Sequence, residues 1–102
     1  MYPSLEYIPC YETVAASQTD QVIGTTAAGA AKDYLSHIII QPGTTGAGTV
    51  TVKDGSTTIF TFTTGTLADL RPIIIPIGLK AATGWKITTG ANVTVTAFGH
   101  WQ

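Results

Sequence analysis

Charged residues are scarce in this 102-residue chain. They make up 11 % of it, against about 25 % in ordinary soluble domains, and five basic side chains against six acidic ones leave a net charge of −1. The chain has no run of lysine or arginine that could displace counterions from a phosphate backbone, which argues against nucleic-acid binding. Because 44 % of the residues are apolar, the composition also excludes a disordered chain, which would combine low hydrophobicity with high charge.

Cysteine and long apolar runs are equally rare. The single cysteine, Cys10, cannot form an internal disulfide, so we expect synthesis in a reducing cytoplasm. We interpret Cys10 as a bystander thiol, with an intersubunit disulfide as the alternative. The longest purely apolar runs span only three residues, too few for a membrane helix. Residues 1–6 lack the basic and apolar regions of a signal peptide, so none is expected.

Patterns that carry catalysis or metal binding are also missing. His37 and His100 do not show the H-x-H or H-x-x-x-H spacing of metal sites. His37 lies on a strongly apolar segment and is interpreted as a buried core residue, and His100 as a terminal or interface residue. The acids are scattered singly, no serine stands in G-x-S-x-G, and the glycine-rich segment 43–48 lacks the lysine of a phosphate loop. The sequence therefore predicts no enzyme, no cofactor and no metal site.

Threonine, alanine and glycine dominate instead, with 19, 12 and 11 residues. Short segments alternate between polar and apolar residues with period two, which is typical of half-buried strands, and no stretch shows a long helical stripe. Turn residues separate about eight such segments, which predicts one all-β domain over residues 12–102, a compact β-sandwich or jelly roll. The expected strands are 12–17, 21–24, 34–41, 49–53, 57–63, 71–79, 85–88 and 93–97.

Turn residues also predict two hairpins. Between 49–53 and 57–63, a three-residue loop over 53–55 would place Val52 opposite Ser56 and put Gly55 in the left-handed conformation. The valines of the first strand and the phenylalanines of the second would then share one face, whereas a two-residue loop would separate them. We therefore favour the three-residue loop. The second hairpin would join 85–88 to 93–97 through residues 89–92.

Two prolines, Pro72 and Pro76, mark the segment 71–79. A proline has no N–H, and two prolines four residues apart remove two donors that would point to the same lateral side. We therefore expect an edge strand, or a strand along a gap in the sheet, whose open side is blunted against pairing with other chains.

The first eleven residues form an apolar and aromatic segment that its prolines keep extended. We interpret 1–11 as an N-terminal arm. It either folds back over its own sandwich or lies on another subunit, where tyrosine supplies a large contact area with a polar tip. The residues expected to contact a partner lie in this arm, in the proline-marked strand and near the C-terminus: Tyr2, Leu5, Tyr7, Ile8, Tyr11, Pro72, Pro76 and Trp101.

The two tryptophans raise a further possibility. Exposed aromatic side chains on a β-sandwich can stack against sugar rings, as in a carbohydrate-binding module. Trp85, however, alternates in phase with Ile87, which favours a place in the core.

Five segments carry a resemblance that covers nearly the whole chain. They are 15–24 (AASQTDQVIG), 33–42 (DYLSHIIIQP), 48–55 (GTVTVKDG), 70–76 (LRPIIIP) and 84–90 (GWKITTG). With the threonine-rich, charge-poor composition and the extended arm, they resemble the small accessory structural proteins of tailed-bacteriophage virions, and among these the capsid decoration, or cement, proteins.

The resemblance implies a protein without catalytic activity that is made in the host cytoplasm and binds the outer capsid surface. The implied partners are the major capsid protein and further copies of the chain itself, as a trimer. Two alternatives stay open. One is another virion component, such as a β domain of the tail, neck or fibre, and the other is a carbohydrate-binding module.

Overall fold

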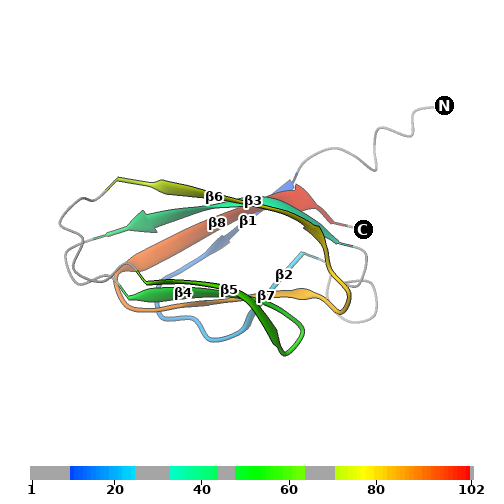
Figure 1. Ribbon diagram of the computed structural model, residues 1–102. Coiled ribbons are helices and arrows are strands. Elements are labelled where there is room, and N and C mark those ends of the chain that lie inside the picture. The colour runs from blue at the N-terminus through cyan, green and yellow to red at the C-terminus, as the bar shows by residue number, and fades with distance from the viewer. Residues whose placement is uncertain (1–9, 25–32, 44–47, 64–70, 102) are drawn as a thin grey trace.

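The computed structural model describes residues 10–24, 33–43, 48–63 and 71–101, which form a sandwich of two four-stranded antiparallel sheets (Figure 1). The all-β sandwich and its eight strands confirm the expected fold class. Within the described residues, no helix is long and apolar enough to cross a membrane. The strands are β1 Cys10–Val14, β2 Gln21–Ile23, β3 Tyr34–Pro42, β4 Thr49–Asp54, β5 Thr57–Thr63, β6 Ile73–Lys80, β7 Trp85–Thr89 and β8 Val93–His100.

The chain alternates between the two sheets. Sheet A has the order β1-β8-β3-β6 and sheet B the order β2-β7-β4-β5, so every connection crosses the sandwich except the one between β4 and β5. In space β1 pairs with β8, β2 with β7, β3 with β6 and β4 with β5. The eight strands therefore form one long hairpin that is folded over on itself.

The hairpin expected between β7 and β8 is not formed. β7 lies between β2 and β4 in sheet B, whereas β8 lies between β1 and β3 in sheet A, so residues 90–92 carry the chain across the sandwich. Alternation along a strand shows that one of its faces is buried. This alternation does not tell whether the next strand in the chain pairs beside the first or lies in the opposite sheet. The prediction of a hairpin was wrong for this reason.

The β4–β5 hairpin has the predicted faces but a different register. Val50 lies opposite Phe62 and Val52 opposite Phe60, so the valines and phenylalanines share the inner face as expected. The predicted pairing of Val52 with Ser56 is wrong, because the loop has only two residues, 55–56, and a bulge at residue 59 shifts the phase by one. Gly55 has a φ of +64°, in the left-handed conformation that was predicted for it.

The core between the sheets consists of inward-facing aliphatic side chains and one tryptophan. Only 1 % of the Trp85 surface is exposed, and its indole Nε1 donates a hydrogen bond to the carbonyl oxygen of Asp33 at 3.1 Å. The interpretation of Trp85 as a core residue is confirmed, and this residue offers no platform for a sugar.

Burial of the inward-facing aliphatic and aromatic side chains differs between the two sides of the sandwich. On the β1–β2 side, the inward-facing Val14 and Ile23 are fully buried. On the β5–β6 side, the inward-facing side chains are only half-buried: Phe60, Phe62, Ile73, Ile75 and Ile77. The described sandwich is therefore less fully closed between its edge strands β5 and β6.

β6 is an edge strand, as its prolines predict, and β3 is its neighbour in sheet A. Pro76 lies opposite His37, and Pro72 comes just before the strand; both prolines are exposed. At the other edge of sheet A, β1 begins at Cys10, so Tyr11 is part of the sheet although the arm was expected to run to residue 11. The other arm residues singled out from the sequence, Tyr2, Leu5, Tyr7 and Ile8, lie outside the described residues.

Candidate docking face

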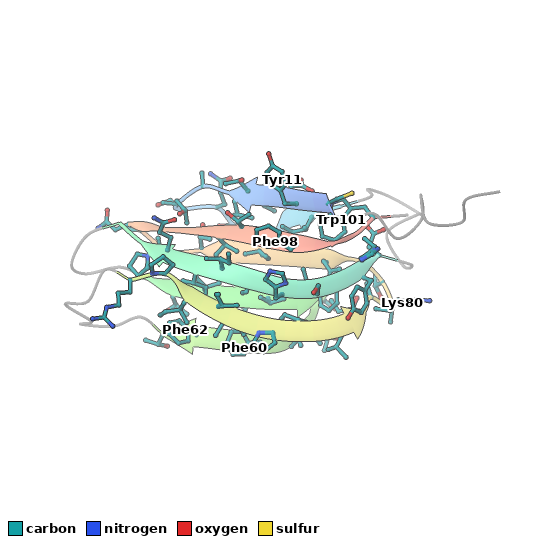
Figure 2. The ribbon with its side chains drawn as sticks, turned by 90° about the horizontal axis from the view of Figure 1, so that it is seen from above. Tyr11, Phe60, Phe62, Lys80, Phe98 and Trp101 are labelled. Carbon is teal, nitrogen blue, oxygen red and sulfur yellow. The ribbon has the colours of Figure 1, made fainter. Side chains whose placement is uncertain are left out.

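One row of side chains on the outer face of sheet A crosses all four strands. Tyr11 lies opposite Phe98, Phe98 opposite His37, and His37 opposite Pro76. Figure 2, which views sheet A from outside, shows Tyr11 on β1 and Phe98 on the neighbouring β8. We call these four residues the aromatic row.

Rings of the aromatic row contact one another from strand to strand. His37 and Phe98 stack with their centroids 4.6 Å and their planes 9° apart, and Tyr11 lies 6.3 Å from Phe98 at 39°. The hydroxyl of Ser36 lies 3.1 Å from Nδ1 of His37. One face of the Phe98 ring is therefore covered by His37, and Tyr11 lies near the same ring in a tilted arrangement.

A second row beside the aromatic row extends the surface. Thr13, Thr96, Ile39 and Ile74 lie opposite one another across the same four strands. Ile74 is 64 % exposed, more than any other large aliphatic side chain of the described residues. The two rows together cover the middle of the sheet with aromatic, aliphatic and threonine side chains.

The end of sheet A next to the aromatic row carries the charged residue of the outer face. Tyr34 lies between His100 and Lys80, with the His100 ring edge-on at 5.7 Å. Among the described outward-facing residues of sheet A, Lys80 is the one with a formal charge at neutral pH. We call this outer surface, with its two rows and the Tyr34 end, the A face.

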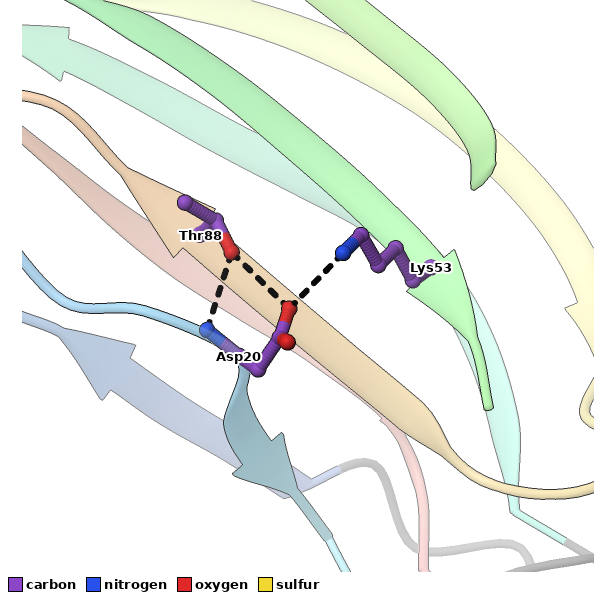
Figure 3. A network of polar contacts seen from close by, with 3 residues as sticks. All are labelled: Asp20, Lys53 and Thr88. Carbon is purple, nitrogen blue, oxygen red and sulfur yellow. Dashed lines mark hydrogen bonds and ion pairs between the residues drawn. The ribbon is translucent and has the colours of Figure 1, made fainter. Parts of the chain in front are cut away.

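The outer face of sheet B has a different composition. Thr88, Thr51 and Thr61 form a row across β7, β4 and β5. Close to this row, Nζ of Lys53 lies 3.1 Å from Oδ1 of Asp20, and the Thr88 hydroxyl donates to the same oxygen at 3.1 Å (Figure 3). These contacts with Lys53 and then Thr88 hold the pKa of Asp20 below its usual range. With Lys53, Lys86 and this ion pair, the outer face of sheet B carries more charge than the A face, so the A face is the candidate surface for a partner.

The predicted contact residues divide between the A face and other places. Tyr11, which is 69 % exposed, and Pro76 both belong to the aromatic row. Trp101 is half-buried and covers two glycines: a Cβ on Gly24 would come within 2.9 Å of its Cε3, and one on Gly99 within 2.8 Å of its Cζ3. Trp101 therefore packs on its own chain, and its contact with a partner stays a prediction.

The interpretation of His37 as a buried core residue is wrong. His37 is half-buried on the outer face rather than a core residue, because a bulge between Leu35 and His37 shifts the alternation of β3 by one residue. Phe98 and Ile74 also belong to the A face and were not singled out. Alternation with the buried residues of β8 and β6 could have shown that both side chains face outward. The sequence does not show the strand order that brings them onto one face.

Two carboxylates in the described residues accept hydrogen bonds from backbone N–H groups. No three histidine, cysteine or acidic side chains in the described ranges come together as metal ligands. Oε1 of Glu12 accepts a hydrogen bond from Gly24 N at 2.7 Å, and the carboxylate of Asp54 accepts three from the loop 82–84. These carboxylates stabilise turns.

Comparison of the chain with protein-family models, with curated proteins and with solved structures found no match. The two outer faces of the sandwich are therefore the main structural ground on which a function can be assigned.

Proposed function

We propose that this chain is a structural protein of a phage virion, which binds the outer capsid surface through the A face and thereby stabilises the shell. The observation that carries the proposal is the difference between the two outer faces of the sandwich. The A face carries the exposed side chains of Tyr11 and Ile74 and one formal charge, and large apolar side chains exposed on one face favour an interaction site. Aromatic residues are enriched and charged residues depleted at the centres of protein interfaces, which fits the composition of the A face.

The strand order supports a jelly-roll description of the sandwich. Pairing of β1 with β8, β2 with β7, β3 with β6 and β4 with β5 is the order of a hairpin rolled into two four-stranded sheets. Jelly rolls occur in viral capsid proteins and also in lectins. Two features favour a protein partner over a sugar: Trp85 is buried in the core, and His37 is stacked on the Phe98 ring.

The size of the A face indicates how tightly one copy binds. Four strands about 4.8 Å apart and some seven residues of about 3.4 Å each give a surface of roughly 500 Å². This is less than the about 800 Å² per partner of a stable protein complex, so a single contact is weak. Many copies that each bridge neighbouring capsid subunits still stabilise the shell, because they bind the assembled state and not its separated parts.

The first experiment locates the chain on the particle. Purified virions of the phage that encodes it are separated into heads and tails, and mass spectrometry measures the amount of the chain in each fraction. The proposal predicts many copies with the heads. Recovery with the tails alone, or absence from both fractions, would overturn it, and recovery with tails would establish the alternative virion component.

The second experiment tests the A face with a matched pair of variants. Thr96→Lys places a charge in the middle of the A face, on the central strand β8, and Thr51→Lys places the same charge on the central strand β4 of sheet B. Burying an unpaired lysine in the contact should weaken cosedimentation with heads that lack the protein by about tenfold or more. Thr51→Lys should sediment with heads like the native chain. Equal binding of both variants would refute the A face as the contact.

A further inference from the structure

β5 is the least protected of the four edge strands in the described sandwich. Natural proteins blunt the edges of sheets with short strands, charges, prolines or bulges. β2 has only three residues, β1 contains Glu12, and β6 contains Pro76 together with Gly78 at a φ of +65°. β5 has seven residues, none of them charged, proline or glycine, and its one bulge lies near the turn, at Ile59.

The backbone groups of β5 that point to the open edge follow from the ladder of sheet B. Gly90 N donates to the carbonyl oxygen of Thr49, so Thr49 directs its backbone groups toward β7. Alternation along β4 then directs those of the two valines toward β5, where their partners are Phe60 and Phe62. Thr61, between these phenylalanines, consequently directs its N–H and C=O groups to the open edge.

Side chains along this edge are also incompletely covered. The Phe60 and Phe62 rings are half-buried and stack on each other with centroids 6.4 Å apart. Figure 2 shows both at the edge of the molecule beside β6. The inward-facing isoleucines of β6 are half-buried above them, and Ile59 is 40 % exposed.

We propose that β5 pairs antiparallel with β5 of a second copy of this chain, about a two-fold axis at Thr61. In this register the two Thr61 residues exchange two N–H···O hydrogen bonds. Each Phe60 lies opposite Phe62 of the second copy, in the pairs without backbone hydrogen bonds, where side chains approach most closely. The second copy is the occupant because one segment supplies complementary halves of the contact: open backbone groups at Thr61 and a phenylalanine on either side of it.

This pairing sets the direction of the two A faces. Residues paired across strands keep their side chains on the same side of the sheet, so the two-fold axis is perpendicular to sheet B. The dimer has one continuous eight-stranded B sheet, with both A sheets on the same side of it and both A faces pointing the same way. It therefore attaches to one underlying surface at two points, which raises the effective affinity of a weak contact. This consequence rests on the proposed function, whereas the pairing itself does not.

Light scattering after size exclusion of the purified native chain, from micromolar to millimolar concentration, tests the pairing. The strand contact is smaller than the about 1,200 Å² that stable complexes bury, so we expect dissociation in the micromolar range. Thr61→Lys places two like charges opposite each other at the axis and should raise the dissociation constant by about tenfold or more. Thr51→Lys is the matched control, because Thr51 lies directly opposite Thr61 in the same row but away from the edge.

The expected mass is twice the 10.6 kDa chain mass for the native chain and Thr51→Lys, whereas Thr61→Lys should reach this mass only at concentrations about tenfold higher or more. Mixing Thr61→Lys with Thr61→Glu should restore the two-chain mass, which shows that both variants are folded. A native chain that stays monomeric, the three-chain mass that the resemblance implies, or a Thr61→Lys variant that dimerises like the native chain would each overturn the pairing. Because these masses are measured without capsids, their outcome is independent of the sedimentation test of the A face.

Discussion

Asp54 holds the loop before β7 against the β4–β5 turn. Its Oδ2 accepts a hydrogen bond from Ala82 N at 2.8 Å, and its Oδ1 accepts from Thr83 N at 2.8 Å and Gly84 N at 3.0 Å. Asp54→Ala removes the acceptor of three backbone donors, which water can replace in part at this surface. We expect the free energy of unfolding to fall by about 2 kcal/mol, as for loss of a strong helix cap, and the midpoint of thermal unfolding by about 10 °C.

The charge of Asp54 makes this contribution depend on pH. Burial raises the pKa of Asp54, but the three backbone N–H donors together outweigh it and lower the pKa below its usual value. A carboxyl whose pKa is lower in the folded state adds stability above its unfolded pKa of about 3.9, and this is lost as the pH falls through the folded value. Asp54→Asn, which keeps the shape and loses the charge, should therefore be less stable than the native chain at neutral pH, with a deficit that shrinks below about pH 4.

Urea unfolding followed by tryptophan fluorescence at several pH values measures both effects. Asp20→Asn is the comparison: this carboxylate also has a lowered pKa, but it makes an exposed ion pair with Lys53, so its deficit should be the smaller of the two. Equal stability of Asp54→Ala and the native chain at neutral pH would refute the anchoring role. A deficit of Asp54→Asn that stays constant into acid would refute the part assigned to its charge.

Three further substitutions test the packing. In Trp101→Phe the remaining Trp85 is buried, so its fluorescence should resist quenching by acrylamide; strong quenching would contradict its place in the core. Thr89→Val removes a buried hydroxyl that accepts from Gln18 N at 3.0 Å, and should cost about 1–3 kcal/mol in urea unfolding, whereas no loss would show that this hydrogen bond is dispensable. Gly99→Ala places a methyl group against the Trp101 ring and the backbone of β3, and should lower the thermal midpoint by several degrees; an unchanged midpoint would contradict that close approach.

Features with a local cause could be predicted from the sequence. Pro76 marks an edge strand because a missing N–H has the same effect in any sheet. The shared face of Val52 and Phe60 followed from the requirement that apolar side chains be buried together. The register did not follow, because a two-residue loop with a bulge and a three-residue loop without one satisfy the same requirement.

Features that depend on the bulge in β3 could not be predicted. The extra residue between Leu35 and His37 moves His37 to the outer face, and no residue type in this stretch marks the shift. Counting alternation from Leu35 therefore places every residue before the bulge correctly and His37 on the wrong side. The A face gains its stacked ring pair from this displacement, since His37 meets Phe98 only in the shifted phase.

The aromatic row is a product of topology rather than of any sequence motif. Its members, Tyr11, His37, Pro76 and Phe98, come from four strands that the chain reaches in separate passes through sheet A, with strands of sheet B between successive passes. No spacing within the sequence could connect residues so far apart. Once the order β1-β8-β3-β6 is known, the members of the aromatic row follow from which residues of each strand face outward. Only His37 also requires knowledge of the bulge in β3. The same folded hairpin places β5 at the edge of sheet B, where Phe60 and Phe62 are half-buried. One topology therefore forms both the A face and the edge that we propose for pairing.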